Sequence, residues 1–168
     1  VVFRPKNDAN VAYINVFNSG RWRSVDWTKK EDNKYIFDNL GVDLVYLPSV
    51  FKRRRMFFNA FPILLDETGK AKILKPDFKN TFDANLNRQN EFKNDYKENN
   101  PLEIESGKEY LLYYWSRGWK KLGKSGATKS GVFFKNLPQN TLFRLIPRKN
   151  SRFMRIFIID PKTKKIWW

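Results

Sequence analysis

Residues 12–25 read AYINVFNSGRWRSV, and residues 110–122 read YLLYYWSRGWKKL. Each stretch is an apolar run followed by a short turn with Ser and Gly, a tryptophan, a basic residue and an aliphatic residue. An apolar run before such a turn is typical of a β-hairpin. Trp22 and Trp119, which follow the two turns, lie 97 positions apart. The two stretches therefore predict similar hairpins in the two halves of the chain.

Two further blocks repeat in the same order. Residues 35–48 (YIFDNLGVDLVYLP) and 132–147 (VFFKNLPQNTLFRLIP) share an Asn-Leu pair, again 97 positions apart. Residues 56–74 (MFFNAFPILLDETGKAKIL) and 154–168 (MRIFIIDPKTKKIWW) both read as an apolar strand, an Asp-led turn and a Lys-flanked strand. Three blocks in one order indicate an internal duplication.

The pattern within each copy is that of strands. Polar and apolar residues alternate in 43–47 and in 141–145, and Gly- or Asn-containing turns recur at hairpin intervals. We find no stretch of ten or more residues with a helical apolar period and caps. We therefore predict an all-β chain of two small tandem antiparallel β-sandwich repeats, with about five to seven strands each. One fused barrel is the alternative.

Residues 77–100 differ from both flanks. They hold seven Asn and no Gly, Val, Ile or Trp, and their charges nearly cancel. Because Asn and Asp compete with the backbone for hydrogen bonds and favour turns, we interpret this segment as a polar linker with at most one short strand or helical turn. The predicted domains are repeat 1 over 1–76, the linker over 77–100, and repeat 2 over 101–168.

Composition excludes several classes of chemistry. The chain has 168 residues, a net charge of +16, no Cys and no His. Disulfides, Ser-His-Asp and Cys-His catalysis and HExxH zinc sites are therefore excluded within this chain. We expect no enzyme activity, no metal and no cofactor. An enzyme using only Asp/Glu, Lys, Ser or Tyr is a remaining alternative, and it predicts two carboxylates about 5–9 Å apart in a cleft.

The sequence opens with VVFRPKNDAN, in which no basic region is followed by an apolar run and a cleavage site. It also lacks an initiator Met, so we expect a piece of a longer protein. No apolar stretch approaches the ~20 residues of a membrane-spanning helix.

Aromatic residues are the first candidate binding site. Tyr113, Tyr114, Trp115 and Trp119, with Trp22 as the counterpart in repeat 1, could stack on sugar rings or bases. Because neighbouring side chains on a strand face opposite sides, some of them could instead fill the core or an interface between the repeats. The terminal Trp167-Trp168 pair is expected to fix the last strand, with one ring outside it.

Basic residues are the second candidate. Lys52-Arg53-Arg54-Arg55 is expected at a hairpin tip, where it could bind polyanions or could be a solvated loop that discourages edge-to-edge aggregation. Net charge is +6 in 1–76 and +11 in 101–168. The second repeat carries a related basic set near its turns: Lys120, Lys121, Lys124, Lys129, Arg148, Lys149, Arg152 and Arg155.

Carboxylates are the third candidate. Glu103, Glu105 and Glu109 cluster before repeat 2, and paired carboxylates can serve glycoside hydrolysis or calcium binding. Asp66 and Asp160 begin equivalent turns in the two repeats, so a turn role explains both residues.

Several stretches resemble the C-terminal β-sandwich region of Bacteroidetes surface proteins with a transglutaminase-like core. They are YLLYYWSRGWKKLGK (110–124), VFFKNLPQNTLFRL (132–145), the terminal IWW, FDNLGVDLVYLP (37–48) and FPILLDETGKAKIL (61–74), although Phe61-Pro62 inverts the family's Pro-Phe order. The family's papain-like Cys-His-Asp site cannot be carried over, because this chain has neither Cys nor His. The resemblance implies a non-catalytic accessory region of an exported, envelope-attached protein.

The expected function is that of an accessory or binding module within a larger exported protein. It would position an N-terminal catalytic domain of that protein or bind a polymeric cell-envelope or glycan ligand. The alternative is a stand-alone polyanion-binding protein, for nucleic acid or an acidic glycan, whose binding weakens steeply with salt.

Overall fold

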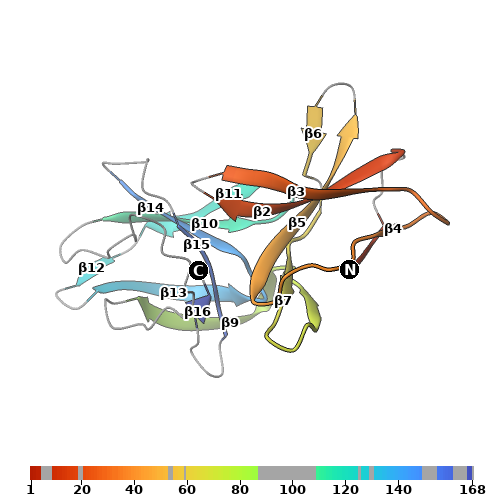
Figure 1. Cartoon of the computed structure of the whole chain (residues 1–168). Coiled ribbons are helices and arrows are strands. Elements are labelled where there is room, and N and C mark those ends of the chain that lie inside the picture. The colour runs from red at the N-terminus through yellow and green to blue at the C-terminus, as the bar shows by residue number, and fades with distance from the viewer. Residues whose placement is uncertain are drawn as a thin grey trace. The chain divides into compact units, whose positions relative to one another are not determined.

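The computed structural model is all-β, and its strands form antiparallel sheets (Figure 1). The structure describes residues 1–4, 9–18, 21–52, 55–58, 60–86, 109–124, 126–128, 131–148, 155–160 and 166–167. These residues contain no helix, and therefore none that could cross a membrane. The predicted fold class is confirmed.

The chain divides into two compact units, Val1–Leu74 and Lys75–Trp168. This boundary differs from the predicted domains, because residues 77–86 form a strand of unit 2 and are not a linker. Residues 87–100, the rest of the expected linker, lie outside the described residues. Every described sheet takes its strands from one unit, so the alternative of one fused barrel is not observed.

Unit 1 contains a two-stranded sheet and a six-stranded sheet. The small sheet pairs β1 with β4; the large sheet has the order β3-β2-β5-β7-β8, and β6 also pairs with β5. The strands are β1 (Val2–Phe3), β2 (Val11–Asn18), β3 (Arg21–Lys29), β4 (Tyr35–Ile36), β5 (Leu44–Lys52), β6 (Arg55–Phe57), β7 (Ile63–Leu65) and β8 (Ala71–Ile73).

The core of unit 1 combines residues of both sheets. It includes Ile14 of β2, Tyr35 of β4, Tyr46 of β5 and Leu65 of β7, all buried. The hydroxyl of Tyr46 donates a hydrogen bond of 2.9 Å to the carbonyl oxygen of Gly41, which satisfies the one polar atom of a buried ring. Burial of these rings compensates for the small size of the unit.

Unit 2 contains a three-stranded sheet, β12-β13-β9, and a five-stranded sheet, β11-β10-β14-β15-β16. The strands are β9 (Asp77–Leu86), β10 (Tyr110–Trp115), β11 (Trp119–Lys124), β12 (Gly126–Thr128), β13 (Gly131–Gln139), β14 (Phe143–Pro147), β15 (Arg155–Ile159) and β16 (Ile166–Trp167).

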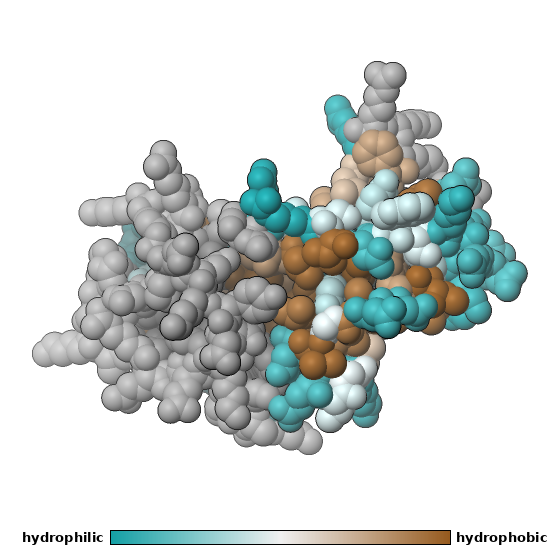
Figure 2. Space-filling view, viewed as in Figure 1, coloured by the Kyte–Doolittle hydropathy of each residue, from teal (hydrophilic) through white to brown (hydrophobic). Residues whose placement is uncertain are grey.

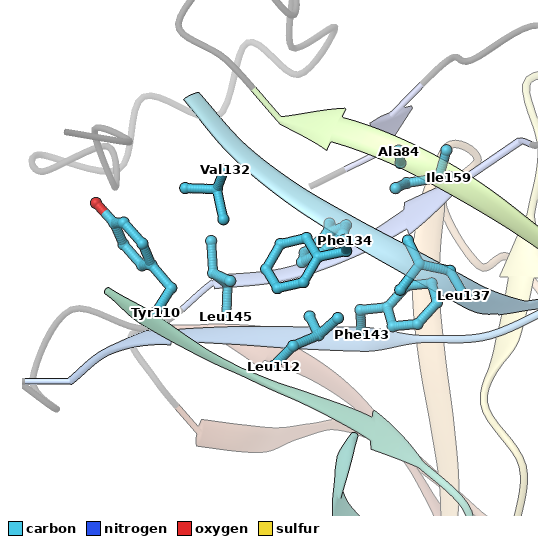
Figure 3. Packing of buried hydrophobic residues seen from close by; sticks show 10 residues of the cluster. Ala84, Tyr110, Leu112, Val132, Phe134, Leu137, Phe143, Leu145 and Ile159 are labelled. Carbon is cyan, nitrogen blue, oxygen red and sulfur yellow. The ribbon is translucent and has the colours of Figure 1, made fainter. Parts of the chain in front are cut away.

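The core of unit 2 lies between these two sheets, as in a β-sandwich. Figure 3 shows Phe134 and Leu137 of β13 directed toward Leu112 of β10 and Phe143 of β14. The Phe143 ring stacks on the ring of Phe157, with 5.4 Å between centroids. Alternate residues of β10 and β14 therefore face this core, and the residues between them lie on the opposite face of the five-stranded sheet.

The two units share the order of their main strands. In both, a hairpin precedes a strand of the smaller sheet and three strands of the larger sheet, so that β3-β2-β5-β7-β8 corresponds to β11-β10-β14-β15-β16. Among the described strands, β6 of unit 1 and β12 of unit 2 have no counterpart in the other unit. Two pairs of left-handed residues also lie 97 positions apart: Asn39 (φ 55°) with Asn136 (φ 54°), and Asp43 (φ 57°) with Asn140 (φ 51°). Asn and Asp tolerate this conformation better than most residues. The duplication is thus visible in backbone conformation as well as in sequence.

Candidate functional site

The candidate site lies on the face of the five-stranded sheet of unit 2 that is opposite the core, called here the Arg144 face. Tyr113 of β10 is the cross-strand partner of Arg144 on β14 and of Lys121 on β11. Cross-strand partners share a face, so these three side chains form one row across three neighbouring strands. Trp115 and Trp119, which are also partners, form the next row.

The guanidinium of Arg144 is placed against two aromatic rings. Its Cζ lies 4.9 Å from the centroid of the Tyr113 ring and 4.5 Å from that of the Trp119 ring. A cation this close to an aromatic face is attracted by the ring quadrupole. The Trp119 ring is itself held edge-to-face by Trp115, with 5.1 Å between centroids and 87° between planes. Trp115 is buried, so it supports the site and is not exposed to a ligand.

Arg144 is a half-buried cation without a counter-ion among the described residues. Neither an ion pair nor a hydrogen bond to it occurs in that part of the chain, and its buried Nε has no acceptor there. Burial lowers the pKa of Arg144, because desolvation disfavours the charged form, and an electrostatic interaction with Tyr113 opposes this effect in part. Arg remains protonated in proteins, so the site presents a positive charge and free N–H donors.

The other predicted aromatic residues lie elsewhere. Tyr114 is on the core side of the sheet, where it packs against the core and contacts the Phe78 ring edge-to-face at 5.2 Å. Trp22 lies in unit 1, edge-to-face with Phe17 at 5.4 Å. The side chains of Trp167 and Trp168 lie outside the described residues. The structure thus joins Tyr113 and Trp119 with an arginine, and it separates Tyr114 and Trp22 from them.

Arg144 is not among the site residues that the sequence predicts. A signal was present, because Phe143 and Leu145 are both buried and Arg144 is the one cation in this apolar strand. The pairing of Arg144 with Tyr113, however, depends on the register of β10 and β14, which are joined by a long segment of chain.

The predicted basic tetrad lies on the β5–β6 hairpin. Lys52 ends β5 and pairs with Arg55 at the start of β6, and Arg55 is exposed, while Arg53 and Arg54 lie outside the described residues. Figure 1 shows this hairpin extending beyond the neighbouring strands of unit 1. Phe51 and Phe57 on its two strands are 50% and 38% exposed. Figure 2 shows hydrophobic and hydrophilic atoms side by side over this part of unit 1.

The second basic set is not a single patch of free cations. Lys120, Lys121 and Lys124 are exposed on β11, whereas Arg148 is paired with the carboxylate of Glu109. Lys129, Lys149 and Arg152 lie in the part of the chain that is not described, as does the side chain of Arg155.

The carboxylate of Asp66, which the sequence places at a turn, serves a structural contact. Oδ1 of Asp66 accepts hydrogen bonds from Thr68 N (2.9 Å), Thr68 Oγ1 (2.7 Å) and Lys70 N (2.9 Å), which close the turn after β7. These bonds lower the pKa of Asp66, the Thr68 side chain contributing most. Among the residues that the structure describes, no group of three or more acidic side chains gathers. Glu103 and Glu105 lie outside them.

Unit 2 also contains a cavity of about 440 Å³ between its sheets. Its described lining is apolar apart from two lysines: Leu112, Leu122, Gly123, Lys124, Phe133, Phe134, Lys135 and Leu137. No carboxylate is among these residues, so they do not supply the paired acids that the enzyme alternative requires.

Comparisons with protein-family models, with curated proteins and with solved structures find no match to this chain. The resemblance to transglutaminase-like surface proteins therefore stays a prediction from the sequence.

Proposed function

We propose that the chain is a non-catalytic binding module that recognises an acidic glycan through the Arg144 face of unit 2. The observation that carries the proposal is the Arg144 guanidinium, half-buried between the rings of Tyr113 and Trp119 and without a counter-ion in the described chain. Within the larger exported protein that the sequence resemblance implies, such a module would hold a catalytic domain near a polymeric substrate.

The chemistry of the site favours an anion attached to a ring-shaped group. Arginine offers planar, paired N–H donors that match a carboxylate or sulfate in a bidentate manner. The partly exposed rings of Tyr113 and Trp119 beside the guanidinium provide apolar surface that a sugar ring can contact. The ligand would accept the hydrogen bonds that the half-buried Arg144 lacks. The free energy of binding becomes more favourable as a result, because a buried donor without an acceptor is costly.

A second cation in the same row favours a polymer over a single small anion. Lys121 and Arg144 lie on opposite sides of Tyr113, two strands apart. Strand spacing places their backbone positions roughly 10 Å from each other. Repeated negative charges along an extended chain could contact both, and the net charge of +16 adds long-range attraction.

The test is a titration of the full chain with an oligogalacturonate and with its fully methyl-esterified form, which has the same rings but no charge. We expect the acid form to bind and to shift the tryptophan fluorescence, and we expect binding to weaken with added salt. Arg144→Gln should weaken binding at least about tenfold, because it removes a charge-assisted contact.

The matched control comes from the other unit. Trp119→Ala should weaken binding, whereas Trp22→Ala, at the equivalent position of unit 1, should leave it unchanged. Equal binding of the esterified oligosaccharide, or equal loss in both tryptophan variants, would contradict the proposal.

The β5–β6 hairpin favours a second candidate, in which unit 1 binds single-stranded nucleic acid. Exposed aromatic rings beside cations are the elements that such binding uses. The exposed Phe57 shares a face of the hairpin with the Lys52–Arg55 pair, and the exposed Phe51 lies on the other face. A Lys52→Gln/Arg55→Gln variant should then lose affinity for a labelled oligothymidylate in fluorescence anisotropy. If only the Arg144 site binds ligand, this variant will behave like the parent chain with both polymers.

A further inference from the structure

We infer that the cavity of unit 2 is a second binding site, for an amphipathic anion of the fatty-carboxylate class. The apolar chain of the ligand would fill the space between β11 and β13, and its carboxylate would lie beside Lys124 and Lys135. None of the described residues that line the cavity contacts the Arg144 guanidinium, and the inference does not depend on the proposed glycan binding.

The size and lining of the cavity fit such a ligand. A volume of about 440 Å³ falls within the range of small-molecule sites, roughly 300–1,000 Å³. Leu112, Phe134 and Leu137, which Figure 3 shows among the core side chains, also line the cavity. The cavity is partly open to solvent and its lining is mostly apolar, so an apolar chain bound there would remove apolar surface from water.

An irregularity in the edge strand accounts for the space. The β10–β11 register shifts so that Leu112 pairs with Gly123 and Tyr113 pairs with Lys121. Leu122 is thus the extra residue of a β-bulge, which bends the edge strand away from regular pairing. Gly123 contributes no side chain, and a Cβ atom built there would meet no heavy atom within 4 Å. The cavity is therefore open at Gly123, where a residue with a side chain would fill part of it.

The two lysines select the charge of the ligand. Lys124 and Lys135 both line the cavity and are exposed. In the described part of the chain neither forms an ion pair, and Lys135 Nζ lies 6.0 Å from the centroid of the Phe133 ring. An ammonium group on a long flexible stem can reach a carboxylate at the mouth while its methylene groups cover apolar surface. An anionic head with an apolar chain matches both features.

The experiment titrates the full chain with dodecanoate below its micellar concentration and with dodecanol as the uncharged analogue, by NMR chemical shifts and thermal unfolding. We expect dodecanoate to shift resonances of the cavity residues and to raise the Tm of unit 2. Dodecanol should bind at least about fivefold more weakly, because it lacks the charge that contacts the lysines.

Two variants separate the apolar and the ionic contributions. Gly123→Leu should abolish binding, because a side chain at 123 shares the face of its partner Leu112 and fills the cavity. Lys124→Gln/Lys135→Gln should lower dodecanoate affinity about tenfold and leave dodecanol affinity unchanged. Lys120→Gln, on the same strand but outside the cavity lining, is the matched control.

Unchanged dodecanoate binding in Gly123→Leu, or no binding by the parent chain, would overturn the inference. If Gly123→Leu fails to fold, the lysine double variant decides, because equal loss of dodecanoate and dodecanol would exclude the ionic contact. Oligogalacturonate binding is measured in the same samples. It should persist when dodecanoate binding is lost, so failure of this inference can be distinguished from failure of the proposed function.

Discussion

Units 1 and 2 share a framework but differ on the sheet face opposite the core. In unit 1 the pairing of β2 with β5 sets Asn15 opposite Leu47, and in unit 2 the equivalent pairing of β10 with β14 sets Tyr113 opposite Arg144. The strand orders are the same. The shared features are those of the backbone, and the difference lies in the side chains that this face carries.

The polar groups at these equivalent positions have different uses. In unit 1 the amide nitrogen of the buried Asn15 donates 2.8 Å hydrogen bonds to the carbonyl oxygen of Leu47 and to Oγ of Ser49. In unit 2 Arg144 has no such partner among the described residues. Unit 1 therefore uses this face for internal structure, whereas unit 2 leaves donors available for a ligand.

The largest expected effect tests the shared framework at the repeated Asn-Leu pair. Leu137 is fully buried in the core of unit 2, whereas Leu40 at the equivalent place is only partly buried. Leu137→Ala should destabilise unit 2 by about 2–5 kcal/mol, as for other buried leucines. Leu40→Ala should cost unit 1 roughly half as much or less, because less apolar area leaves water there.

Hydrogen exchange read by mass spectrometry, followed through a urea titration, reports on peptides of each unit separately. This matters because a chain of two units need not unfold in one step. If both variants lose the same free energy of unfolding, the two leucines are packed similarly, although their exposed fractions differ.

A smaller effect tests the internal use of polar groups in unit 1. Ser49→Ala should destabilise unit 1 by about 1–3 kcal/mol, because it leaves one buried N–H of Asn15 without an acceptor. Ser24→Ala removes an exposed hydroxyl with a 3.4 Å contact and should change stability by less than about 0.5 kcal/mol. Urea unfolding of both variants measures the contrast, and equal values would argue against a structural role for the Asn15 contacts.

Much of the fold could be predicted because its signals are local. The turns after residues 18 and 115, the alternation in β14 and the Asn-Leu pairs all come from short stretches of sequence. β9 was assigned mostly to a linker because its Asn and Asp residues favour turns. It forms a strand because it pairs with β13, Ala84 opposite Phe134, and this distant partner overrides local propensity.

The candidate site could be predicted only in part for the same reason. Trp119 and Tyr113 were found by composition, and alternation indicated that Tyr114 and Trp115 would point to opposite faces. Nothing local to Arg144 shows that it reaches the Trp119 ring, since this requires the registers of two strand pairs at once. The cavity requires in addition the bulge at Leu122.

A further prediction tests the equivalence of the left-handed turns. Asn39→Ala and Asn136→Ala should each destabilise their own unit by about 1 kcal/mol, because both positions have a positive φ. Alanine is disfavoured in this conformation, whereas Asn and Asp tolerate it. Replacement by Gly should not carry this penalty, because Gly adopts a positive φ readily. Thermal unfolding with unit-resolved hydrogen exchange gives the two values, and a large difference between them would break the correspondence at 97 positions.

The smallest effect concerns the turn after β7, whose counterpart after Asp160 lies outside the described residues. Hydrogen bonds from Thr68 and Lys70 hold the pKa of Asp66 below its ordinary value near 3.8, so the folded chain binds this proton less readily than the unfolded chain. The stabilisation is therefore present in full above the unfolded pKa and is lost as the pH falls through the lower, folded pKa. The Tm difference between the parent chain and Asp66→Asn should be constant near neutral pH and should shrink below about pH 3.8. It should appear in unit 1 only, with the exposed Asp38→Asn as the control. A difference that grows on acidification would have the wrong sign and would exclude this role for Asp66.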